Sequence, residues 1–227
     1  MKNLLRTISL VTKNNIMRQR LELVLKYFPQ LTEDQILKFN ELASQYRHWT
    51  SLIKVFPERN FETFYEHQVL HSLAIAKVIS FPPGSTILDV GTGGGFPGIP
   101  LAILFPECNF TLIDSMHKRI IVVQSVIDSI ALKNASAVHG KIEDYFEQFD
   151  FVVSRAVKEF PIFVGLVQKN FDFKLLSENL NGILYLKGGN FEDELANLDW
   201  QFKVYEISDF FMERYFQSKK IIYLTLA

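Results

Sequence analysis

A glycine-rich segment at residues 87–98 contains the residue types in this chain that most clearly predict ligand chemistry. It reads Ile-Leu-Asp-Val-Gly-Thr-Gly-Gly-Gly-Phe-Pro-Gly. Because glycine has no side chain, such a run allows the backbone to turn sharply after a strand and allows a ligand to approach the main chain closely. We therefore expect a small-molecule binding loop here, between the end of a strand and the start of a helix.

Three loop patterns can be compared with this segment. A P-loop requires Gly-Lys-Ser or Gly-Lys-Thr before its helix, and the segment has neither. The glycines satisfy the dinucleotide spacing Gly-x-Gly-x-x-Gly, but Pro97 stiffens the point where a pyrophosphate would meet the helix N-terminus. The third pattern is an acid followed by Gly-x-Gly-x-Gly, and it is filled by Asp89, Gly91, Gly93 and Gly95. A loop of this third kind cradles a ligand that carries no phosphate.

The third pattern resembles motif I of the Rossmann-like S-adenosylmethionine methyltransferases. In such a fold a second acid ends the next strand, where it hydrogen-bonds ribose hydroxyls, and Asp114, about 20 residues further on, has that position. Phe96 is expected to pack on the cofactor, with packing in the protein core as the alternative. The resemblance implies S-adenosylmethionine as the cofactor, while NAD and a loop without a ligand are the weaker alternatives.

The segments around the loop predict an α/β fold. From residue 86 onwards short apolar runs alternate with amphipathic ones, a pattern typical of a parallel, doubly wound sheet. Strands are expected at residues 86–90, 109–114, 135–139, 149–154, 182–187, 202–207 and 220–226. Helices are expected at residues 98–105, 118–129, 143–146 and 161–169. Since no long helix separates the last two strands, we expect them to pair antiparallel at the sheet edge.

The chain before the sheet is expected to be helical. Residues 1–16 have no clear period and are interpreted as a loose extension, residues 17–80 as a helical cap and residues 81–227 as the domain that carries the sheet. Thr32 and Gln35 form a capping box. The helix that they open has an apolar face consisting of Ile36, Phe39, Leu42, Ala43 and Tyr46. A further helix is expected over residues 60–79.

Composition limits the other functions. The chain has 227 residues, of which 48% are hydrophobic, enough for one α/β domain with an appendage. A formal net charge of −1 gives no electrostatic argument for a nucleic-acid partner. The single cysteine, Cys108, favours a reducing, cytoplasmic setting, and no apolar run approaches the roughly 20 residues of a membrane helix. The five histidines form no metal-binding spacing, so no metal is expected.

A closer resemblance covers the chain from about residue 27 to its C-terminus. Four segments occur in the order and spacing of one family: residues 91–103, Asp114-Ser115 with Lys118-Arg119, Ser154-Arg155-Ala156, and Lys187-Gly188-Gly189. In these segments the chain resembles the glucose-inhibited division protein B family, the bacterial 16S rRNA guanine-N7 methyltransferases. The resemblance implies a Rossmann-like, seven-stranded methyltransferase domain with an N-terminal helical cap. It also implies methyl transfer to N7 of a guanine in the decoding region of 16S rRNA.

The resemblance further implies which residues form the site. The cofactor-binding residues would be Gly91, Gly93, Phe96, Asp114, Ile142, Glu143 and Arg155. From its place at the carboxyl end of a strand, Arg155 would also orient the guanine, and Lys187, after the fifth strand, would hold a phosphate of the RNA. Lys118 and Arg119 are basic residues that would bind RNA as well. The alternatives are a surface arginine at 155, a solvated lysine at 187 and, for Glu143, a carboxylate favoured by a helix dipole. Guanine N7 carries a free lone pair, so the reaction needs no general base, in agreement with a sequence that offers no recognisable acid–base pair.

Two segments depart from the family pattern. After Trp49 the chain has Lys54-Val55-Phe56 where the family usually has Asn-Leu-Thr. At residues 67–72 it reads His-Gln-Val-Leu-His-Ser where the family usually has Arg-His-x-Leu-Asp-Ser, so Gln68 and His71 replace a histidine and an aspartate. A non-catalytic RNA-binding assembly factor therefore stays open as an alternative, as does a methyltransferase for a small molecule or a protein.

The expected partner is 16S rRNA or a precursor of the small ribosomal subunit, bound by a monomer. Three basic pairs would border an RNA groove or, as the plainer alternative, belong to a solvated face; they are Arg18/Arg20, Lys118/Arg119 and Lys219/Lys220.

Overall fold

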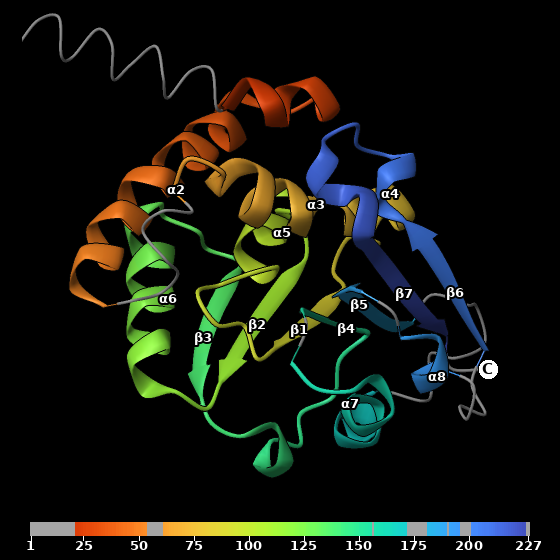
Figure 1. The fold of residues 1–227 in the computed structure, drawn as a ribbon. Coiled ribbons are helices and arrows are strands. Elements are labelled where there is room, and N and C mark those ends of the chain that lie inside the picture. Colours follow the sequence, from red (N-terminus) through yellow and green to blue (C-terminus); the bar gives the residue numbers. More distant parts are fainter. Residues whose placement is uncertain are drawn as a thin grey trace, which may run out of the picture.

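The computed structural model describes residues 21–53, 61–155, 157–171, 181–189, 191–195 and 201–225 (Figure 1). These residues form a seven-stranded sheet with helices on both faces, in the strand order β3-β2-β1-β4-β5-β7-β6. The fold class predicted from the sequence is thus confirmed. The predicted extension at residues 1–16 and the departure at Lys54-Val55-Phe56 lie outside the described residues.

The sheet is parallel over five strands and antiparallel at one edge. Its strands are β1 (Thr86–Val90), β2 (Asn109–Asp114), β3 (Ala135–His139), β4 (Phe151–Arg155), β5 (Gly182–Gly188), β6 (Gln201–Glu206) and β7 (Lys219–Thr225). β7 lies antiparallel between β5 and β6, which confirms the antiparallel pair predicted for the last two strands. β4 begins later than predicted, because Phe149 forms only an isolated bridge with Phe171.

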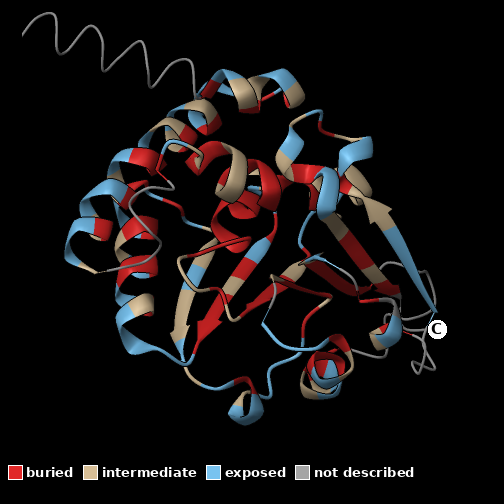
Figure 2. Ribbon diagram, viewed as in Figure 1, coloured by how far each residue is buried: buried red, intermediate tan, exposed pale blue. Residues whose placement is uncertain are grey.

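Helices on the two faces of the sheet bury two separate apolar clusters. One cluster includes residues of α2 (Glu33–Leu52), α5 (Gly98–Leu104) and α6 (His117–Ser129), and the other includes residues of α7 (Phe160–Val167) and α8 (Glu192–Leu195). Because successive strand side chains point to opposite faces, the neighbours Ile87 and Leu88 of β1 belong to different clusters. Figure 2 shows that buried residues follow the strands and the helix faces packed on them.

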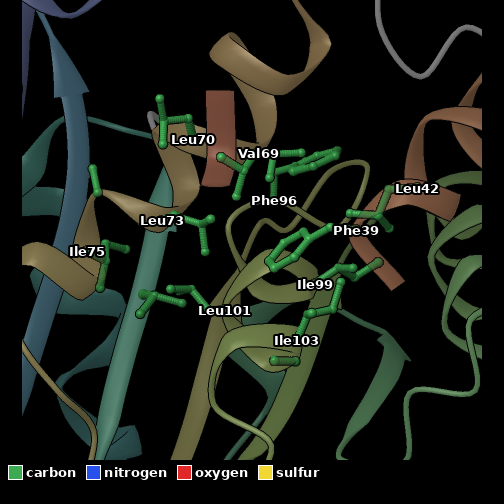
Figure 3. Close-up of a cluster of buried hydrophobic side chains, with 14 of the residues drawn as sticks. Phe39, Leu42, Val69, Leu70, Leu73, Ile75, Phe96, Ile99, Leu101 and Ile103 are labelled. Carbon is green, nitrogen blue, oxygen red and sulfur yellow. The ribbon is translucent and has the colours of Figure 1, made fainter. Parts of the chain in front are cut away.

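The N-terminal helical segments pack on α5 and share its core. They comprise a helix at residues 21–27, α2, the π-helix η2 (Tyr65–Leu70), α3 (His71–Leu73) and α4 (Ile75–Val78). Side chains of α2, η2 and α3 meet those of α5 in one cluster; Figure 3 labels Phe39, Leu42, Val69, Leu70, Leu73, Ile75, Phe96, Ile99, Leu101 and Ile103. The predicted apolar face of α2 is buried, with Ile36 only partly so. The boundary between residues 80 and 81 stays a prediction.

The single helix predicted over residues 60–79 is wrong in detail. The described part of this stretch begins as a π-helix at Tyr65 and is broken at Ala74, between α3 and α4. Ser72 donates its hydroxyl hydrogen to the carbonyl oxygen of Gln68, one turn earlier, at 2.6 Å. Single-turn π-segments often occur at functional sites. Two residues of η2, His67 and Gln68, accept hydrogen bonds from Arg155, which lines the pocket described below.

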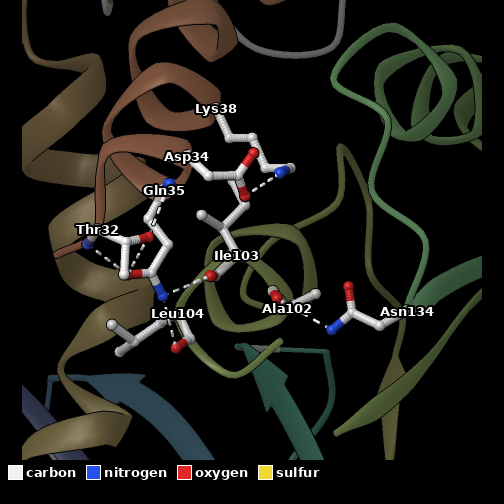
Figure 4. Close-up of polar contacts among 8 residues, drawn as sticks. All are labelled: Thr32, Asp34, Gln35, Lys38, Ala102, Ile103, Leu104 and Asn134. Carbon is white, nitrogen blue, oxygen red and sulfur yellow. Dashed lines mark hydrogen bonds and ion pairs between the residues drawn. The ribbon is translucent and has the colours of Figure 1, made fainter. Parts of the chain in front are cut away.

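Gln35 ties the start of α2 to the end of α5 (Figure 4). Its side-chain oxygen accepts from the backbone N–H of Thr32 at 2.9 Å, which completes the predicted capping box. Its side-chain nitrogen donates to the carbonyl oxygens of Ile103 and Leu104, each at 3.0 Å. Asn134 donates to the neighbouring carbonyl of Ala102 at 3.0 Å. The two amides thus satisfy carbonyls that the last turn of α5 leaves without a helical partner.

Replacement of Gln35 by alanine is expected to lower the free energy of unfolding by about 2–4 kcal/mol, because it opens the capping box and leaves two carbonyls without this donor. Urea denaturation at neutral pH measures this loss. The matched control is Lys38→Gln on the same helix, which removes the ion pair with the exposed Asp34 and should change stability by less than about 1 kcal/mol. Equal losses in the two variants would show that the Gln35 contacts contribute nothing specific.

Candidate functional site

A pocket of about 590 Å³ opens at the carboxyl ends of β1, β2 and β4. All of the residues predicted to bind the cofactor line it: Gly91, Gly93, Phe96, Asp114, Ile142, Glu143 and Arg155. Arg119, predicted to bind RNA, lines it as well, together with Met116, Lys141 and Lys158, which the sequence did not single out. The pocket therefore gathers segments that are far apart in the sequence at the edge where doubly wound sheets bind ligands.

The glycine loop forms one wall of this pocket. Gly91 and Gly93 have φ angles of +66° and +59°, a left-handed conformation that side chains with a Cβ rarely adopt. A Cβ on Gly91 would lie 2.5 Å from Cγ2 of Val157, so packing also requires glycine there. A Cβ on Gly93 would meet nothing closer than the carbonyl oxygen of Gly91, at 3.9 Å. Gly93 therefore presents bare main chain to open space along the pocket wall.

Asp89 stabilises the glycine loop through hydrogen bonds from its two ends. It is fully buried, and its Oδ2 accepts hydrogen bonds from the Thr92 hydroxyl at 2.6 Å and from the Gly98 N–H at 2.8 Å. Its Oδ1 has no hydrogen-bond partner among the described residues. Burial raises the pKa of Asp89 to about 7, although the two hydrogen bonds oppose the shift. Asp89 thus holds the loop against the start of α5 and does not line the pocket.

The raised pKa of Asp89 predicts that stability falls as pH rises. The ordinary pKa of the carboxyl is 3.8, and burial raises it to about 7 in the folded protein. Between these values the folded state retains a proton that the unfolded state has released, so the free energy of unfolding decreases through this window and levels off above it. The Asp89→Asn variant cannot titrate here and should lose this part of the pH dependence. Parallel curves of unfolding free energy against pH for the two proteins would contradict the assignment.

Asp114 is the last residue of β2, as predicted, and its carboxylate already accepts three hydrogen bonds. Its Oδ1 accepts from the Met116 N–H at 2.8 Å, and its Oδ2 accepts from the Gly93 N–H at 2.9 Å and from the Arg119 guanidinium at 3.2 Å. The side chain of Asp114 is 4% exposed, whereas that of Arg119 is 43% exposed. Asp114 therefore fixes the glycine loop, and Arg119 is the contact that a ligand can displace with least disturbance.

Arg155 ends β4 and reaches from the pocket to the N-terminal helices. Its Nη2 donates to the side-chain oxygen of Gln68 at 2.6 Å, and its Nη1 donates to the carbonyl oxygen of His67 at 3.2 Å. The guanidinium carbon lies 5.5 Å from the centre of the Phe96 ring. Burial lowers the pKa of Arg155. The alternative of a surface arginine on a loop does not fit, because Arg155 is the last residue of β4 and its half-buried side chain donates to two residues of η2.

Two residues of the N-terminal helices contact the site in ways that the sequence did not predict. Gln68, noted only as a departure from the family pattern, accepts the hydrogen bond from Arg155. Tyr46, expected only as part of an apolar face, donates its hydroxyl hydrogen to the carbonyl oxygen of Gly94 in the glycine loop. A tyrosine on a buried helix face does predict a polar contact, since its hydroxyl needs a hydrogen-bond partner.

The remaining predicted residues have other partners. Phe96 is 2% exposed and packs on Tyr46, with ring centres 5.0 Å apart, so core packing, its alternative role, is present beside its place in the pocket. Glu143 forms an ion pair with Lys158 at 3.5 Å, at the start of the short helix η3 (Ile142–Asp144). Lys187 forms an ion pair with Glu194 and does not line the pocket.

Lys118 is exposed outside the pocket lining, so the pocket geometry gives Lys118 and Lys187 no role. Over the described parts of the chain, no group of three or more His, Cys, Asp or Glu side chains is arranged to hold a metal ion. None of the helices in those same parts is long and apolar enough to cross a membrane.

Solved structures of low sequence similarity share the fold. A SAM dependent methyltransferase from Aquifex aeolicus matches with a TM-score of 0.54 at 13% identity, covering 78% of this chain and 98% of its own. Fibrillarin from Aeropyrum pernix, solved in complex with S-adenosyl-L-methionine, matches with a TM-score of 0.50 at 14% identity, covering 68% of this chain and 73% of its own. At these identities the matches establish the methyltransferase fold alone.

Sequence comparison identifies the family. The family described as rRNA small subunit methyltransferase G matches residues 35–222. A relative named ribosomal RNA small subunit methyltransferase G, from Christiangramia forsetii, is 48% identical over 206 residues, which cover 91% of this chain and 97% of the relative. A relative of the same name from Cytophaga hutchinsonii is 46% identical, over 90% of this chain and 99% of the relative. The chain therefore belongs to the rRNA small subunit methyltransferase G family, as its sequence motifs predicted.

Proposed function

We propose that this protein transfers a methyl group from S-adenosylmethionine to N7 of a guanine in 16S rRNA. The observation that carries the proposal is a single pocket that unites the glycine loop, the acid at the end of β2 and Arg155 at the end of β4, in a chain of this family. The family and the fold support S-adenosylmethionine as the cofactor. The guanine N7 target is the finer part of the proposal and rests on the family resemblance.

The pocket suits S-adenosylmethionine in size and in its polar groups. A volume of about 590 Å³ lies within the roughly 300–1,000 Å³ of small-molecule sites. Gly93 leaves space beside the main chain for a ligand. The Asp114 carboxylate has about four lone-pair positions, of which three already receive donors, so one is left for a ribose hydroxyl. Displacement of Arg119 would free a second, while Ile142 and Glu143 would border the adenine, as the family resemblance implies.

The chemistry requires orientation more than proton transfer. Bound S-adenosylmethionine supplies an electrophilic methyl group on its sulfonium. The protein has to hold the guanine in line with that methyl and keep water away, and because N7 has a free lone pair, no side chain has to remove a proton. Arg155 suits this task, since Gln68 and His67 fix its guanidinium and leave its remaining N–H groups to donate to guanine O6 or to a phosphate.

The partner in this proposal is 16S rRNA, either free or within a precursor of the small ribosomal subunit, and the enzyme acts as a monomer in the cytoplasm. The helical segment before residue 81 would shape the RNA-facing side, because its η2 helix meets Arg155 beside the pocket. Among the residues that the structure describes, no particular contact favours a second function.

Mass-spectrometric mapping of 16S rRNA from cells with and without this protein tests the proposal. We expect one N7-methylguanine to be lost without the protein and restored when purified protein and S-adenosylmethionine are added to the unmodified subunits. An assembly factor without catalysis would leave the methylation map unchanged in the purified reaction while still binding the RNA. A methyltransferase for a small molecule would neither change the map nor bind the RNA with a strong salt dependence.

A further inference from the structure

We propose that Lys219, Tyr215 and His67 form a subsite for one nucleotide of the RNA substrate, beside the pocket and across Arg155 from the cofactor. This inference rests on the proposed function and names where the RNA strand is held. Neither the family motifs nor the predicted site residues include Tyr215 or His67 in such a role. The sequence marks Lys219 only as half of a basic pair whose plainer alternative is a solvated face.

Arg155 connects the pocket to this subsite, which is called the corner below and consists of Lys219, Tyr215 and His67. It lines the pocket, and its Nη1 donates to the carbonyl oxygen of His67. The His67 ring stacks on the ring of Tyr215, with centres 3.7 Å apart and planes 20° from parallel. Tyr215 belongs to the short helix η7 (Arg214–Ser218), which leads directly into β7, and Lys219 pairs in register with Gly188 at the carboxyl end of β5. The corner therefore lies at the same sheet edge as the pocket.

The side chains of this corner are ordered by contacts yet reachable from solvent. The His67 side chain is 27% exposed, and Tyr215 and Lys219 are half-buried. The Tyr215 hydroxyl lies 3.3 Å from Nδ1 of the buried His71, which fixes the ring at its far end. None of the three residues lines the cofactor pocket itself. A ligand that occupies the pocket would thus leave this corner open for a second group.

Lys219 gives the corner an unneutralised positive charge. Its ammonium lies 5.1 Å from the centre of the Tyr215 ring and forms no ion pair with a carboxylate of the described residues. Its neighbour Lys220 points to the other face of the strand and forms an ion pair with Glu206 at 2.9 Å. The structure thus separates two lysines that look equivalent in the sequence.

The charge at this corner comes from Arg155 and Lys219 and not from the two histidines. Burial and the Lys219 ammonium lower the pKa of His67, and burial, Arg155 and Lys219 lower the pKa of His71 further. Both imidazoles are therefore neutral at pH 7. Glu66 is the carboxylate beside the stack, 3.8 Å from Nε2 of His67, and burial raises its pKa. The Glu213 carboxylate also raises the pKa of Glu66, and it is itself paired with Lys26 at 2.9 Å. Arg155 and Lys219 are thus the cations beside the partly buried Glu66.

Glycine at position 188 makes room for this lysine. A Cβ on Gly188 would lie 2.8 Å from Nζ of Lys219, so a side chain there would displace the ammonium. The Lys-Gly-Gly segment at residues 187–189 was expected to bind phosphate through Lys187, but that lysine is paired with Glu194. We assign the phosphate contact to Lys219 and not to Lys187. The Lys219 ammonium can lie at the end of β5 because Gly188 has no side chain.

An aromatic stack beside a free cation fits single-stranded RNA better than the other partners of this site. A lysine neutralises a backbone phosphate, and aromatic rings offer a face or an edge to an unstacked base. S-adenosylmethionine carries no phosphate for Lys219 to bind. A base turned out of its stack into the pocket would bring its own or the adjacent phosphate to this edge of the sheet.

Methylation kinetics with small ribosomal subunits that lack the modification test the subsite. Lys219→Gln should raise the KM for the subunit about threefold to tenfold and make the slope of log kcat/KM against log salt concentration shallower by about one unit. Lys219→Arg should retain the wild-type values, since it keeps the charge. The matched control is Lys220→Gln, whose lysine is already paired with Glu206, and it should stay within about twofold of the wild type. Calorimetry should give equal S-adenosylmethionine affinity in all four proteins.

The outcomes separate the subsite from the proposed function. If the wild type methylates the subunit but Lys219→Gln keeps its KM and salt slope, the subsite is wrong and the proposed function stands. A loss in Lys220→Gln equal to that in Lys219→Gln would also overturn the subsite, because it would reflect general charge. If the wild type leaves 16S rRNA unmethylated, the proposed function fails and the subsite fails with it.

Discussion

Replacement of Gly93 by valine is expected to abolish the binding of S-adenosylmethionine in calorimetry. The φ of +59° at Gly93 is a conformation that a β-branched residue resists. A Cβ there would project into open space along the pocket wall, since its nearest neighbour would be 3.9 Å away, so the branched side chain would occupy room needed by the ligand. Both effects act on the same main-chain surface, and together they should remove measurable binding.

Gly84→Val separates these two effects. Gly84 has a φ of +85°, and a Cβ there would meet nothing within 4 Å, but it lies in the turn before β1 and not in the pocket lining. This variant should be destabilised by backbone strain of about 1–3 kcal/mol and still bind S-adenosylmethionine like the wild type. Wild-type affinity in Gly93→Val, or NAD binding equal to that of S-adenosylmethionine in the unaltered protein, would contradict the assignment of the loop.

The sheet and the cofactor loop could be predicted because their signals are local. Apolar runs such as residues 86–90 and 109–114 are bounded by turns, and they form strands where the pattern predicts them. The loop was predicted from the identities of consecutive residues, Asp89 to Gly98. The position of Asp114 beside the loop could also be predicted, because β1 and β2 are parallel neighbours and their carboxyl ends therefore lie together.

The contacts of Arg155 could not be predicted, because they are tertiary. Gln68 lies 87 positions earlier in the chain, and its amide meets the guanidinium only because η2 packs over the end of β4. The sequence marked Gln68 as a departure from its family, and a hydrogen-bonding amide in place of a histidine keeps an acceptor at that point. Tyr46 and Tyr215 were missed for the same reason, since an amphipathic pattern predicts which face is buried and not which atoms it meets.

The N-terminal helices and the site are joined by several polar contacts as well as by an apolar core. Tyr46 donates to Gly94, Gln35 to the end of α5, and Arg155 donates in return to η2. The geometry of the glycine loop and of Arg155 therefore depends on how these helices are seated. A substitution that loosens them would be expected to affect cofactor binding without touching the pocket lining.

Arg155→Ala is expected to lower the rate of methyl transfer to 16S rRNA by roughly tenfold to a thousandfold. Loss of one charge-assisted contact in a site shielded from water corresponds to about 1.5–4 kcal/mol. Arg155→Lys should recover only part of the rate, because lysine keeps the charge and loses the planar pair of donors. The measurement is single-turnover methylation at saturating S-adenosylmethionine, at a temperature where each variant is fully folded.

The position of Arg155 between the pocket and η2 demands a control for structure. The side chain donates to Gln68 and His67, so its removal should also lower the melting temperature by several degrees. Gln68→Ala breaks the shorter of these contacts and keeps the guanidinium, and it should therefore lose part of the stability but only about threefold to tenfold of the rate. A rate loss in Gln68→Ala as large as in Arg155→Ala would mean that Arg155 acts by seating the helices. Wild-type single-turnover rates in Arg155→Ala would show that the guanidinium has no part in methyl transfer, because the cofactor site would then work with the β4 end empty of any fixed donor.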